Sequence, residues 1–231
     1  SLGLGLGLGL KTDGGSGPSK SPKETLLASG QAIQVPEAEI STGPPAFTAP
    51  TGMSNVVSYS CTMDVQIAQA GPSWRNIMNN GDPDWPPGTV SRRPAVFITG
   101  NDAAPPNRIH IVHGSTEDQN KNIVTAFAAT PGTYFNLTWV VDNGKLTTYI
   151  NGQKDAAGTV NGTFTWGTNA WKWNAYLTQY PSRKENTAGS VKVKNVYWFN
   201  KALSDADIAT LTGTGAGTTS KYTPEPEGYT A

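Results

Sequence analysis

Apolar and polar residues alternate on both sides of Asn143-Gly144, within the segment YFNLTWVVDNGKLTTYING at residues 134–152. Asn-Gly favours a two-residue type I′ turn, because both central positions of that turn need a positive φ. The pattern therefore predicts a β-hairpin in which Val141 pairs with Leu146 and Trp139 with Thr148. The predicted core face carries Leu137, Trp139, Val141, Leu146 and Ile150, and the predicted exposed face carries Thr138, Val140, Thr147 and Tyr149. A slip of one residue would move Trp139 to the other face, so the register is well specified.

The same alternation recurs along the chain from Val56 onwards. The segments that it predicts as further strands are VVSYSCTMDVQIA, WRNIMNNG, RPAVFITG, RIHIVHG, KNIVTAFAA, TVNGTFTWG, WKWNAYLTQY and SVKVKNVYWFN. Each is bounded by Gly, Pro, Asn or Asp, and a spacing of roughly ten residues is typical of an all-β sandwich rather than of βαβ units. One helix is predicted, because Ser204 is a suitable N-cap for DADIATL and Gly213 a suitable end.

The flanks of this region have the composition of linkers. Residues 1–52 form an extended arm that begins with the low-complexity run SLGLGLGLGL and continues rich in Pro, Gly and Ser. Residues 53–213 form the predicted domain, and residues 214–231 a flexible C-terminal tail. The chain begins at Ser1 without Met, so a membrane anchor upstream of it is one interpretation of the Gly-Leu run. No run of about 20 apolar residues is present in the chain itself.

Charge and cysteine content argue against nucleic-acid binding and exclude an intrachain disulfide. Lys and Arg together number 17, as do Asp and Glu, so no overall charge attracts nucleic acid. Only 15% of the residues are charged, below the roughly 25% usual for soluble domains, and this composition suits an extracellular or virion surface. Cys61 is the only cysteine, so no intrachain disulfide can form. Asn136 and Asn161 begin glycosylation sequons that matter only if the chain meets a glycosylation machinery.

Two segments carry a family resemblance. TYFNLTWVVDNGKLTTYINGQ resembles a segment of laminin-G-like domains in the concanavalin A-like lectin/glucanase superfamily: a Trp, a Val-rich strand, a turn and then Tyr-Ile-Asn-Gly. GSVKVKNVYWFNKALSDADIATL is similar to the closing segment of that family. The resemblance implies a two-sheet antiparallel jelly-roll sandwich with one short C-terminal helix. It implies the fold rather than the function, because this fold serves lectins, adhesion modules, hydrolases and structural proteins.

Catalysis is not expected. The glucanases of this superfamily carry two Glu around an Asp at alternating positions of one strand, which aims the carboxylates at one cleft. The chain lacks such a run: Asp64 stands alone, and Glu117-Asp118 are adjacent, which would place them on opposite faces of a strand. His110 and His113 are three residues apart and also face opposite sides. No P-loop, dinucleotide-binding fingerprint or zinc-spaced cluster is present.

A calcium site at one rim of the sandwich is a candidate, because laminin-G-like domains often bind Ca²⁺ there. In an antiparallel sandwich, the loops at 80–92, 114–120 and 143–144 share one rim. The candidate oxygen ligands are Asp82 and Asp84 first, then Glu117, Asp118, Asp142 and Asn143. The alternative is that NNGDPDWPPG is an ordinary polar loop, since Asp before Pro is common in turns.

Aromatic residues are the candidates for a ligand-binding platform, because aromatic rings stack on sugars and anchor protein interfaces. The candidates in turn-rich segments are Trp85, Trp171, Trp173, Tyr176 and Tyr180. Trp171 and Trp173 are two residues apart and so share a face. The alternative is that this face is the core.

These features predict a non-catalytic structural or attachment protein. Its arm and laminin-G-like domain resemble minor capsid or membrane-linked proteins of large DNA viruses, which implies a virion or a cell surface as its location. Residues 1–50 would then hold the domain in a capsid-like lattice of other proteins. The alternative is a carbohydrate-binding or adhesion module, with or without Ca²⁺. A glycoside hydrolase is the third and weakest interpretation.

Overall fold

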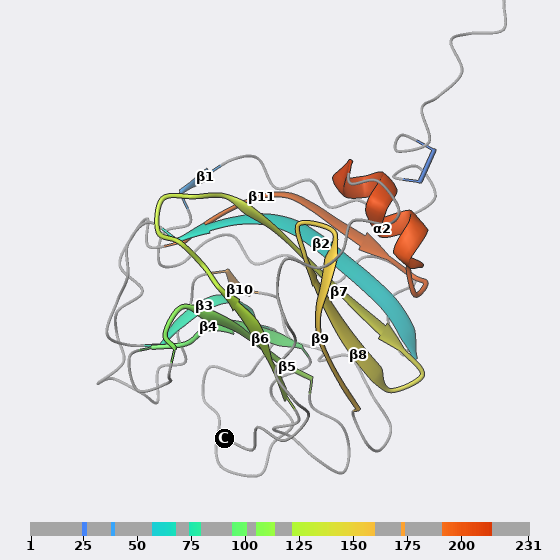
Figure 1. The fold of residues 1–231 in the computed structure, drawn as a ribbon, viewed down its shortest axis with the longest axis horizontal. Coiled ribbons are helices and arrows are strands. Elements are labelled where there is room, and N and C mark those ends of the chain that lie inside the picture. Colours follow the sequence, from blue (N-terminus) through green and yellow to red (C-terminus); the bar gives the residue numbers. More distant parts are fainter. Residues whose placement is uncertain are drawn as a thin grey trace, which may run out of the picture.

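Two antiparallel β-sheets pack face to face, with one helix on the outer side of the larger sheet (Figure 1). The computed structural model describes residues 25–26, 38–39, 57–67, 74–79, 94–100, 105–113, 122–159, 172–173 and 191–213. The predicted all-β sandwich with a short C-terminal helix is confirmed.

The larger sheet has the strand order β1-β11-β2-β7-β8-β9. Its strands are β1 (Ala38–Glu39), β2 (Ser58–Ile67), β7 (Phe135–Asp142), β8 (Lys145–Ile150), β9 (Gln153–Thr159) and β11 (Val191–Phe199). The smaller sheet has the order β10-β3-β4-β5-β6. Its strands are β3 (Arg75–Asn79), β4 (Ala95–Ile98), β5 (Arg108–Val112), β6 (Asn122–Ala128) and β10 (Lys172–Trp173). Helix α2 (Asp205–Thr212) follows β11.

The β7–β8 hairpin has the predicted register. Val141 pairs with Leu146, and Trp139 with Thr148. The turn residues Asn143 and Gly144 have φ values of 47° and 83°, as the type I′ turn requires. All five residues of the predicted core face belong to the cluster between the sheets. Cys61 and Trp198 are fully buried in the same cluster, which confirms them as core residues.

The other face of the hairpin was predicted to be exposed, and that prediction is wrong. Thr138, Val140, Thr147 and Tyr149 are all buried, with at most 7% of their surface exposed. Helix α2 packs on the outer side of the larger sheet and forms a second apolar cluster there with Val140 and Tyr149, whereas the Thr138 hydroxyl hydrogen-bonds to Thr62 and Asn136. We call it the outer cluster; its members are Leu26, Val140, Tyr149, Phe199, Leu203, Ile208 and Leu211. Alternation alone did not reveal that a later helix covers this face.

Helix α2 begins and ends as predicted. The Ser204 hydroxyl accepts a hydrogen bond from the Asp207 N–H, and the Asp207 carboxylate accepts one from the Ser204 N–H, which completes a capping box. Gly213 ends the helix in the left-handed conformation. None of the described helices is long and apolar enough to cross a membrane.

One strand of the larger sheet was not predicted. It is β9 (Gln153–Thr159), whose Ala, Gly and charged residues lack an apolar alternation. The strand predicted at TVNGTFTWG lies outside the described residues except for its first residue, which ends β9. In the arm, the apolar pair Leu26-Leu27 was a candidate to dock on another surface; Leu26 lies in the outer cluster, and Ala38–Glu39 pairs with β11.

A buried polar and aromatic cluster joins the two sheets at the end where the β7–β8 turn lies. The Tyr59 hydroxyl on β2 is 2.8 Å from Nε2 of His113, just after β5, and accepts a hydrogen bond from the Trp139 indole at 3.2 Å. The Tyr59 ring also stacks on His113 and Trp198. Burial lowers the pKa of His113 from 6.5 to about 3, so this imidazole is neutral in the folded protein.

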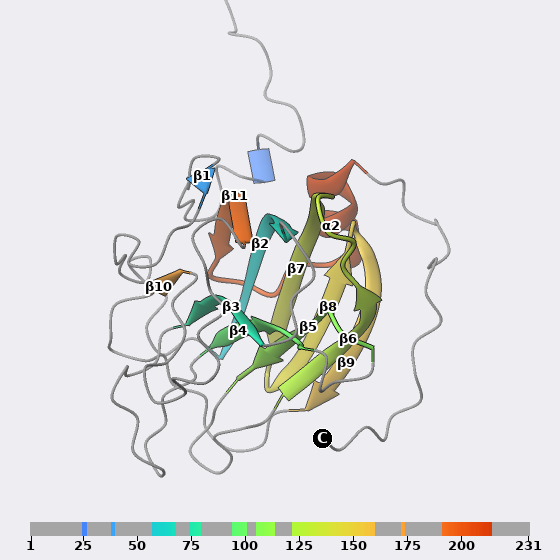
Figure 2. The ribbon, with the colours of Figure 1, turned by 90° about the vertical axis from the view of Figure 1, so that its left-hand side faces the viewer.

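A second link joins the sheets at the edge where β6 and β9 lie side by side (Figure 2). The Asp155 carboxylate on β9 accepts hydrogen bonds from the backbone N–H groups of Ala126 and Phe127 on β6, at 2.8 and 3.0 Å. These two groups lie in a β-bulge, where the β5–β6 register shifts. Thr125 holds the other side of the bulge, because its hydroxyl accepts from the Ile109 N–H and donates to the Phe127 carbonyl.

The neutral state of His113 predicts a specific loss of stability in acid. The unfolded chain takes up a proton at His113 near pH 6.5, whereas the folded chain does so only near pH 3. Stability is therefore complete above pH 6.5 and falls as the pH drops toward 3, by about 1.4 kcal/mol for each pH unit in this range. Urea unfolding at several pH values should show this slope in the wild type and a shallower one in His113→Gln, which cannot be protonated. Equal slopes for the two proteins would contradict the assignment.

Candidate functional site

The outer face of the smaller sheet carries an unusual set of side chains. Along β4, Val96 and Ile98 belong to the core between the sheets, so Ala95 and Phe97 lie on the opposite, outer face. The register pairs Phe97 with Asn76 on β3 and with His110 on β5, so these three residues form a row across that face. His113, by contrast, lies on the inner side. The prediction that the two histidines face opposite sides is confirmed.

An aromatic trio occupies this face. The ring of Trp74, immediately before β3, lies 5.0 Å from the His110 ring at an angle of 65°, and the Phe97 ring lies 6.2 Å from His110 at 66°. Phe97 and His110 are buried, whereas Trp74 is partly exposed. Edge-to-face contacts of this kind hold aromatic rings in a fixed orientation. Trp74 thus presents an aromatic surface to solvent from a rigid base.

Asn76 fixes the strand that carries Trp74. Its side-chain amide donates hydrogen bonds to the carbonyl groups of Met78 and Val96, at 3.1 and 3.3 Å. The β3–β4 register shifts between Asn76 and Met78, so the amide supports a β-bulge. Asn76 is fully buried, and its role is to position β3 rather than to contact a ligand.

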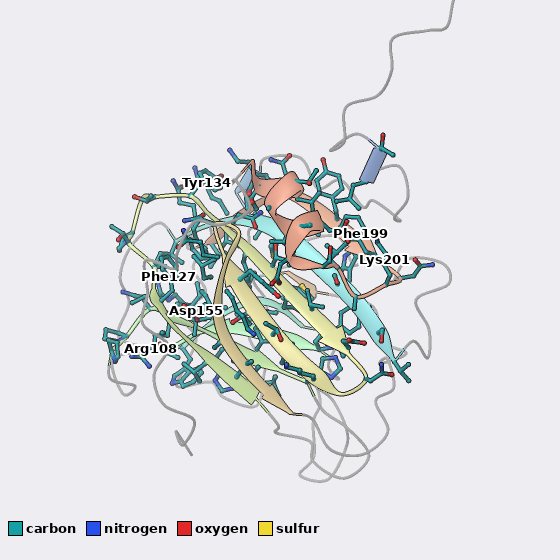
Figure 3. All side chains as sticks on the ribbon, turned by 45° about the vertical axis from the view of Figure 1, so that its right-hand side comes forward. Arg108, Phe127, Tyr134, Asp155, Phe199 and Lys201 are labelled. Atoms are coloured by element: carbon teal, nitrogen blue, oxygen red, sulfur yellow. The ribbon has the colours of Figure 1, made fainter. Side chains whose placement is uncertain are left out.

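Arg108 adds a positive charge to the same face, since it is two residues from His110 on β5. Figure 3 shows Arg108, Asp155 and Phe127 in the region where β5, β6 and β9 meet. Burial raises the pKa of the Asp155 carboxyl, while the N–H groups of Ala126 and Phe127 and the charge of Arg108 act to lower it. The buried Asp155 carboxylate therefore lies within the electrostatic influence of the Arg108 guanidinium.

Three polar side chains lie together at the β7–β8 turn: the hydroxyl of Ser58, the carboxylate of Asp142 and the amide of Asn143. The Ser58 hydroxyl donates to Asp142 Oδ1 at 3.1 Å, and the Asn143 amide donates to the same oxygen at 3.0 Å. The contact of His113 with Tyr59 places the end of β5 at this same end of the sandwich. The end of β5 and the β7–β8 turn therefore lie at one end of the sandwich.

The remaining candidate ligands at this rim, Asp82, Asp84, Glu117 and Asp118, lie outside the described residues. Within the part of the chain that the structure describes, no group of three His, Cys, Asp or Glu side chains converges. Asp142 and Asn143 supply oxygen atoms of the type that Ca²⁺ prefers. The calcium site therefore stays a prediction.

The predicted aromatic platform lies mostly outside the described residues, as Trp85, Trp171, Tyr176 and Tyr180 do. Trp173 is placed by its backbone: it belongs to β10 and pairs with Met78 on β3. The backbone of Trp173 therefore lies beside β3, the strand that Trp74 precedes. Sequence reasoning missed Trp74, although its spacing of two from Asn76 was a signal that both share a face.

The outer face of the larger sheet beyond α2 is occupied by a polar network. The Asn136 amide donates to Thr62 Oγ1 and Asp64 Oδ1, at 3.0 and 3.1 Å, and the Asn195 amide donates to Asp64 Oδ2 at 2.8 Å. Lys194 lies over the Tyr134 ring, 4.0 Å from its centroid. Tyr134 and Tyr197 are partly exposed among the described residues of this face; Tyr134 is in contact with a cation, and Tyr197 packs against the outer cluster.

A family model described as the concanavalin A-like lectin/glucanases superfamily matches residues 41–209. No curated protein sequence matches the chain. Among solved structures, the binding domain of botulinum neurotoxin serotype G aligns with a TM-score of 0.56 and 13% identity, over 76% of this chain and 42% of that one. The binding domain of Paraclostridial Mosquitocidal Protein 1 aligns with a TM-score of 0.54 and 11% identity, over 72% and 39%.

A third structure is the ligand-binding domain of botulinum neurotoxin serotype D in complex with N-acetylneuraminic acid. It aligns with a TM-score of 0.50 and 12% identity, over 74% of this chain and 38% of that one. The chain thus spans about two fifths of the length of these three structures. At such identities the likeness establishes the fold.

The rim prediction is tested by calcium-dependent stability. If Asp82, Asp84 and the 143–144 turn bind Ca²⁺ in the folded state, millimolar Ca²⁺ should raise the melting temperature. At a free Ca²⁺ concentration of 100 times Kd, binding would raise the free energy of unfolding by about 2.7 kcal/mol. Asp82→Ala and Asp142→Asn should lose this shift. Asp64→Asn, outside the rim, is the matched control and should keep it. A wild-type protein whose melting temperature does not respond to Ca²⁺ would exclude the site.

Proposed function

We propose a carbohydrate-binding role for this chain, which belongs to the concanavalin A-like lectin/glucanases superfamily. The proposed contact is made at Trp74, the partly exposed member of the aromatic trio on the outer side of the smaller sheet, whose other two members are buried. The ligand is a glycan that stacks one sugar ring on the Trp74 indole and makes polar contacts around it. The chain itself carries out no reaction on that glycan.

The observation that carries this proposal is the aromatic trio. A sugar ring has an apolar face that packs on an aromatic ring, and its hydroxyl groups need donors and acceptors at the edge of that contact. Trp74 supplies the ring, and its edge-to-face contact with His110 holds it in place. Arg108, which is 8% exposed, places a cationic group on the same face two residues from His110.

A non-catalytic role is supported by the residues of this sheet. Hydrolysis of a glycosidic bond needs two carboxyl groups about 5–10 Å apart on either side of the bond. The described strands of the smaller sheet contain no Asp or Glu. The nearest carboxylate described, Asp155, is bound to two backbone N–H groups of β6 and is 2% exposed.

One structural neighbour guides the choice of a glycan as the ligand. The serotype D binding domain was solved with N-acetylneuraminic acid, which makes sialylated glycans the first class to test. This chain corresponds to only 38% of that structure, so the sugar bound there serves to choose the first probes and does not identify the ligand of this chain. Arg108 is a suitable partner for an acidic sugar, since guanidinium groups bind carboxylates well.

A structural role in a virion was the first expectation from the sequence, and it has less support. It depended on an arm that needs a surrounding assembly to hold it, yet two described points of the arm contact the domain itself. The family match and the neighbours reported above give no support to a capsid role. The locations expected from the sequence, a virion or a cell surface, stay predictions.

A glycan array probed with the full chain tests the proposal. We expect selective binding to a small set of glycans, with sialylated structures among the first to examine. Trp74→Ala should weaken that binding about tenfold, because a lost stacking contact of about 1.4 kcal/mol corresponds to this factor. Trp74→Tyr should retain most of the affinity, since it keeps an aromatic face.

Tyr134→Ala is the matched control, because it removes a partly exposed aromatic ring from the larger sheet. It should leave glycan binding unchanged. Unaltered binding by Trp74→Ala would place the site elsewhere on the molecule. An array on which the wild-type chain binds no glycan would contradict the carbohydrate role itself.

A further inference from the structure

Two successive hairpins of the larger sheet close with the same dipeptide. Asn143-Gly144 joins β7 to β8, and Asn151-Gly152 joins β8 to β9, with two residues in each turn. All four turn residues have positive φ, from 47° to 83°, and Asn-Gly suits such turns. The same dipeptide is chemically labile, because asparagine followed by glycine readily loses its side-chain amide.

This deamidation begins when the backbone nitrogen of the following residue attacks the asparagine Cγ. The bond from Cγ to Nδ2 breaks, and Nδ2 leaves as ammonia with the proton of the attacking nitrogen, so that a cyclic imide remains. Water then opens the imide. Opening at Cγ gives aspartate, whereas opening at the main-chain carbonyl carbon gives isoaspartate, whose backbone runs through the side-chain methylene. Glycine favours the attack because it has no Cβ beside the attacking nitrogen.

The folded structure restrains this reaction strongly at Asn151. Its N–H donates to the Asn136 carbonyl at 2.9 Å, and its Oδ1 accepts a hydrogen bond from the Asn136 N–H at 2.8 Å. The side-chain carbonyl of Asn151 thus continues the ladder between β7 and β8, and this holds Cγ, the atom under attack, against β7. Closure of the imide ring requires the turn to open, so at Asn151 it costs both hydrogen bonds.

The contacts of Asn143 oppose opening of its turn much less. Its N–H donates to the Ser58 hydroxyl at 3.4 Å, which is long for a hydrogen bond, and its side-chain amide donates to Asp142 Oδ1 at 3.0 Å. The second bond joins neighbouring residues, so it can persist while the turn opens. Asn143 and Asp142 are both exposed, and exposed turns open locally at a low free-energy cost.

We propose that Asn143 is a modification site at which the folded chain deamidates spontaneously, and that isoaspartate at this position unlocks the β7–β8 hairpin. Isoaspartate adds a methylene group to the backbone between Asp142 and Lys145, so the two-residue turn can no longer close with its type I′ geometry. This turn sets which residues of β7 face the core, and its loss therefore weakens the register of the larger sheet.

The aspartate product has a milder effect. It keeps the backbone of the turn unchanged, so the register remains. It removes the amide that donates to Asp142 and places a second carboxylate beside it at an exposed position, where repulsion between the two charges is weak. The two products of one reaction thus differ in their effect on the fold, and this difference can be measured.

Incubation of the full chain in warm, mildly alkaline buffer tests the site, with peptide mapping by mass spectrometry to separate asparagine, aspartate and isoaspartate. In urea, where the chain is unfolded, Asn143 and Asn151 should react at similar rates. In the folded chain we expect Asn143 to react at least about tenfold faster than Asn151, which corresponds to about 1.4 kcal/mol of additional opening cost at Asn151. Equal rates in the folded chain, a faster reaction at Asn151 or no reaction at Asn143 would overturn the proposal.

Two variants separate the effects of the backbone and the charge. Asn143→Gly has no amide to lose and keeps a Gly-Gly turn, which also accepts positive φ, so its melting temperature should stay constant during the incubation. Asn143→Asp, the aspartate product, should start close to the melting temperature of the wild type. The wild type should lose thermal stability in proportion to its content of isoaspartate at position 143. A wild type that is fully converted there without such a loss, or an Asn143→Gly variant that ages equally fast, would contradict the structural consequence.

Discussion

The register of the β7–β8 hairpin determines which side chains meet between the two sheets. Asn143 and Gly144 adopt the positive φ angles of the turn, and this sets Trp139 and Val141 on the inner face. Strand β2 pairs along the whole length of β7, so Tyr59 and Cys61 share that inner face. A shift of one residue would expose the core and bury the polar network of Asp64 and Asn136. The sandwich therefore depends on this two-residue turn.

With the register set, two polar contacts fix how the sheets lie on each other. The hydrogen bond between Tyr59 and His113 joins them at the turn end, and Asp155 joins them at the β6–β9 edge. Both contacts are buried, so each is costly to break. Together they hold β5 at its end and β6 at its bulge. The outer face of the smaller sheet, which carries His110 and Trp74, is consequently rigid before any ligand arrives.

The sequence predicted local features well and covering elements poorly. The hairpin register, the helix from Ser204 to Gly213 and the opposite orientations of His110 and His113 follow from periodicity and turn chemistry, which are local. The burial of Tyr149 depends on its contact with helix α2, which is distant in sequence, and alternation cannot reveal such a contact. Trp74 was missed because its significance comes from His110 and Phe97, which lie on two other strands.

The central claim is that a glycan binds on the outer face of the smaller sheet, over Trp74. Its most direct measurement is an NMR titration of the ¹⁵N-labelled chain with sialyllactose, with lactose as the neutral comparison, followed through the indole N–H signals. The account predicts that the Trp74 signal shifts with saturation, while the signals of Trp139 and Trp198, fully buried in the core, stay fixed. An unchanged Trp74 indole signal, together with shifts in the backbone amide signals of Tyr134 and Lys194 on the larger sheet, would contradict it.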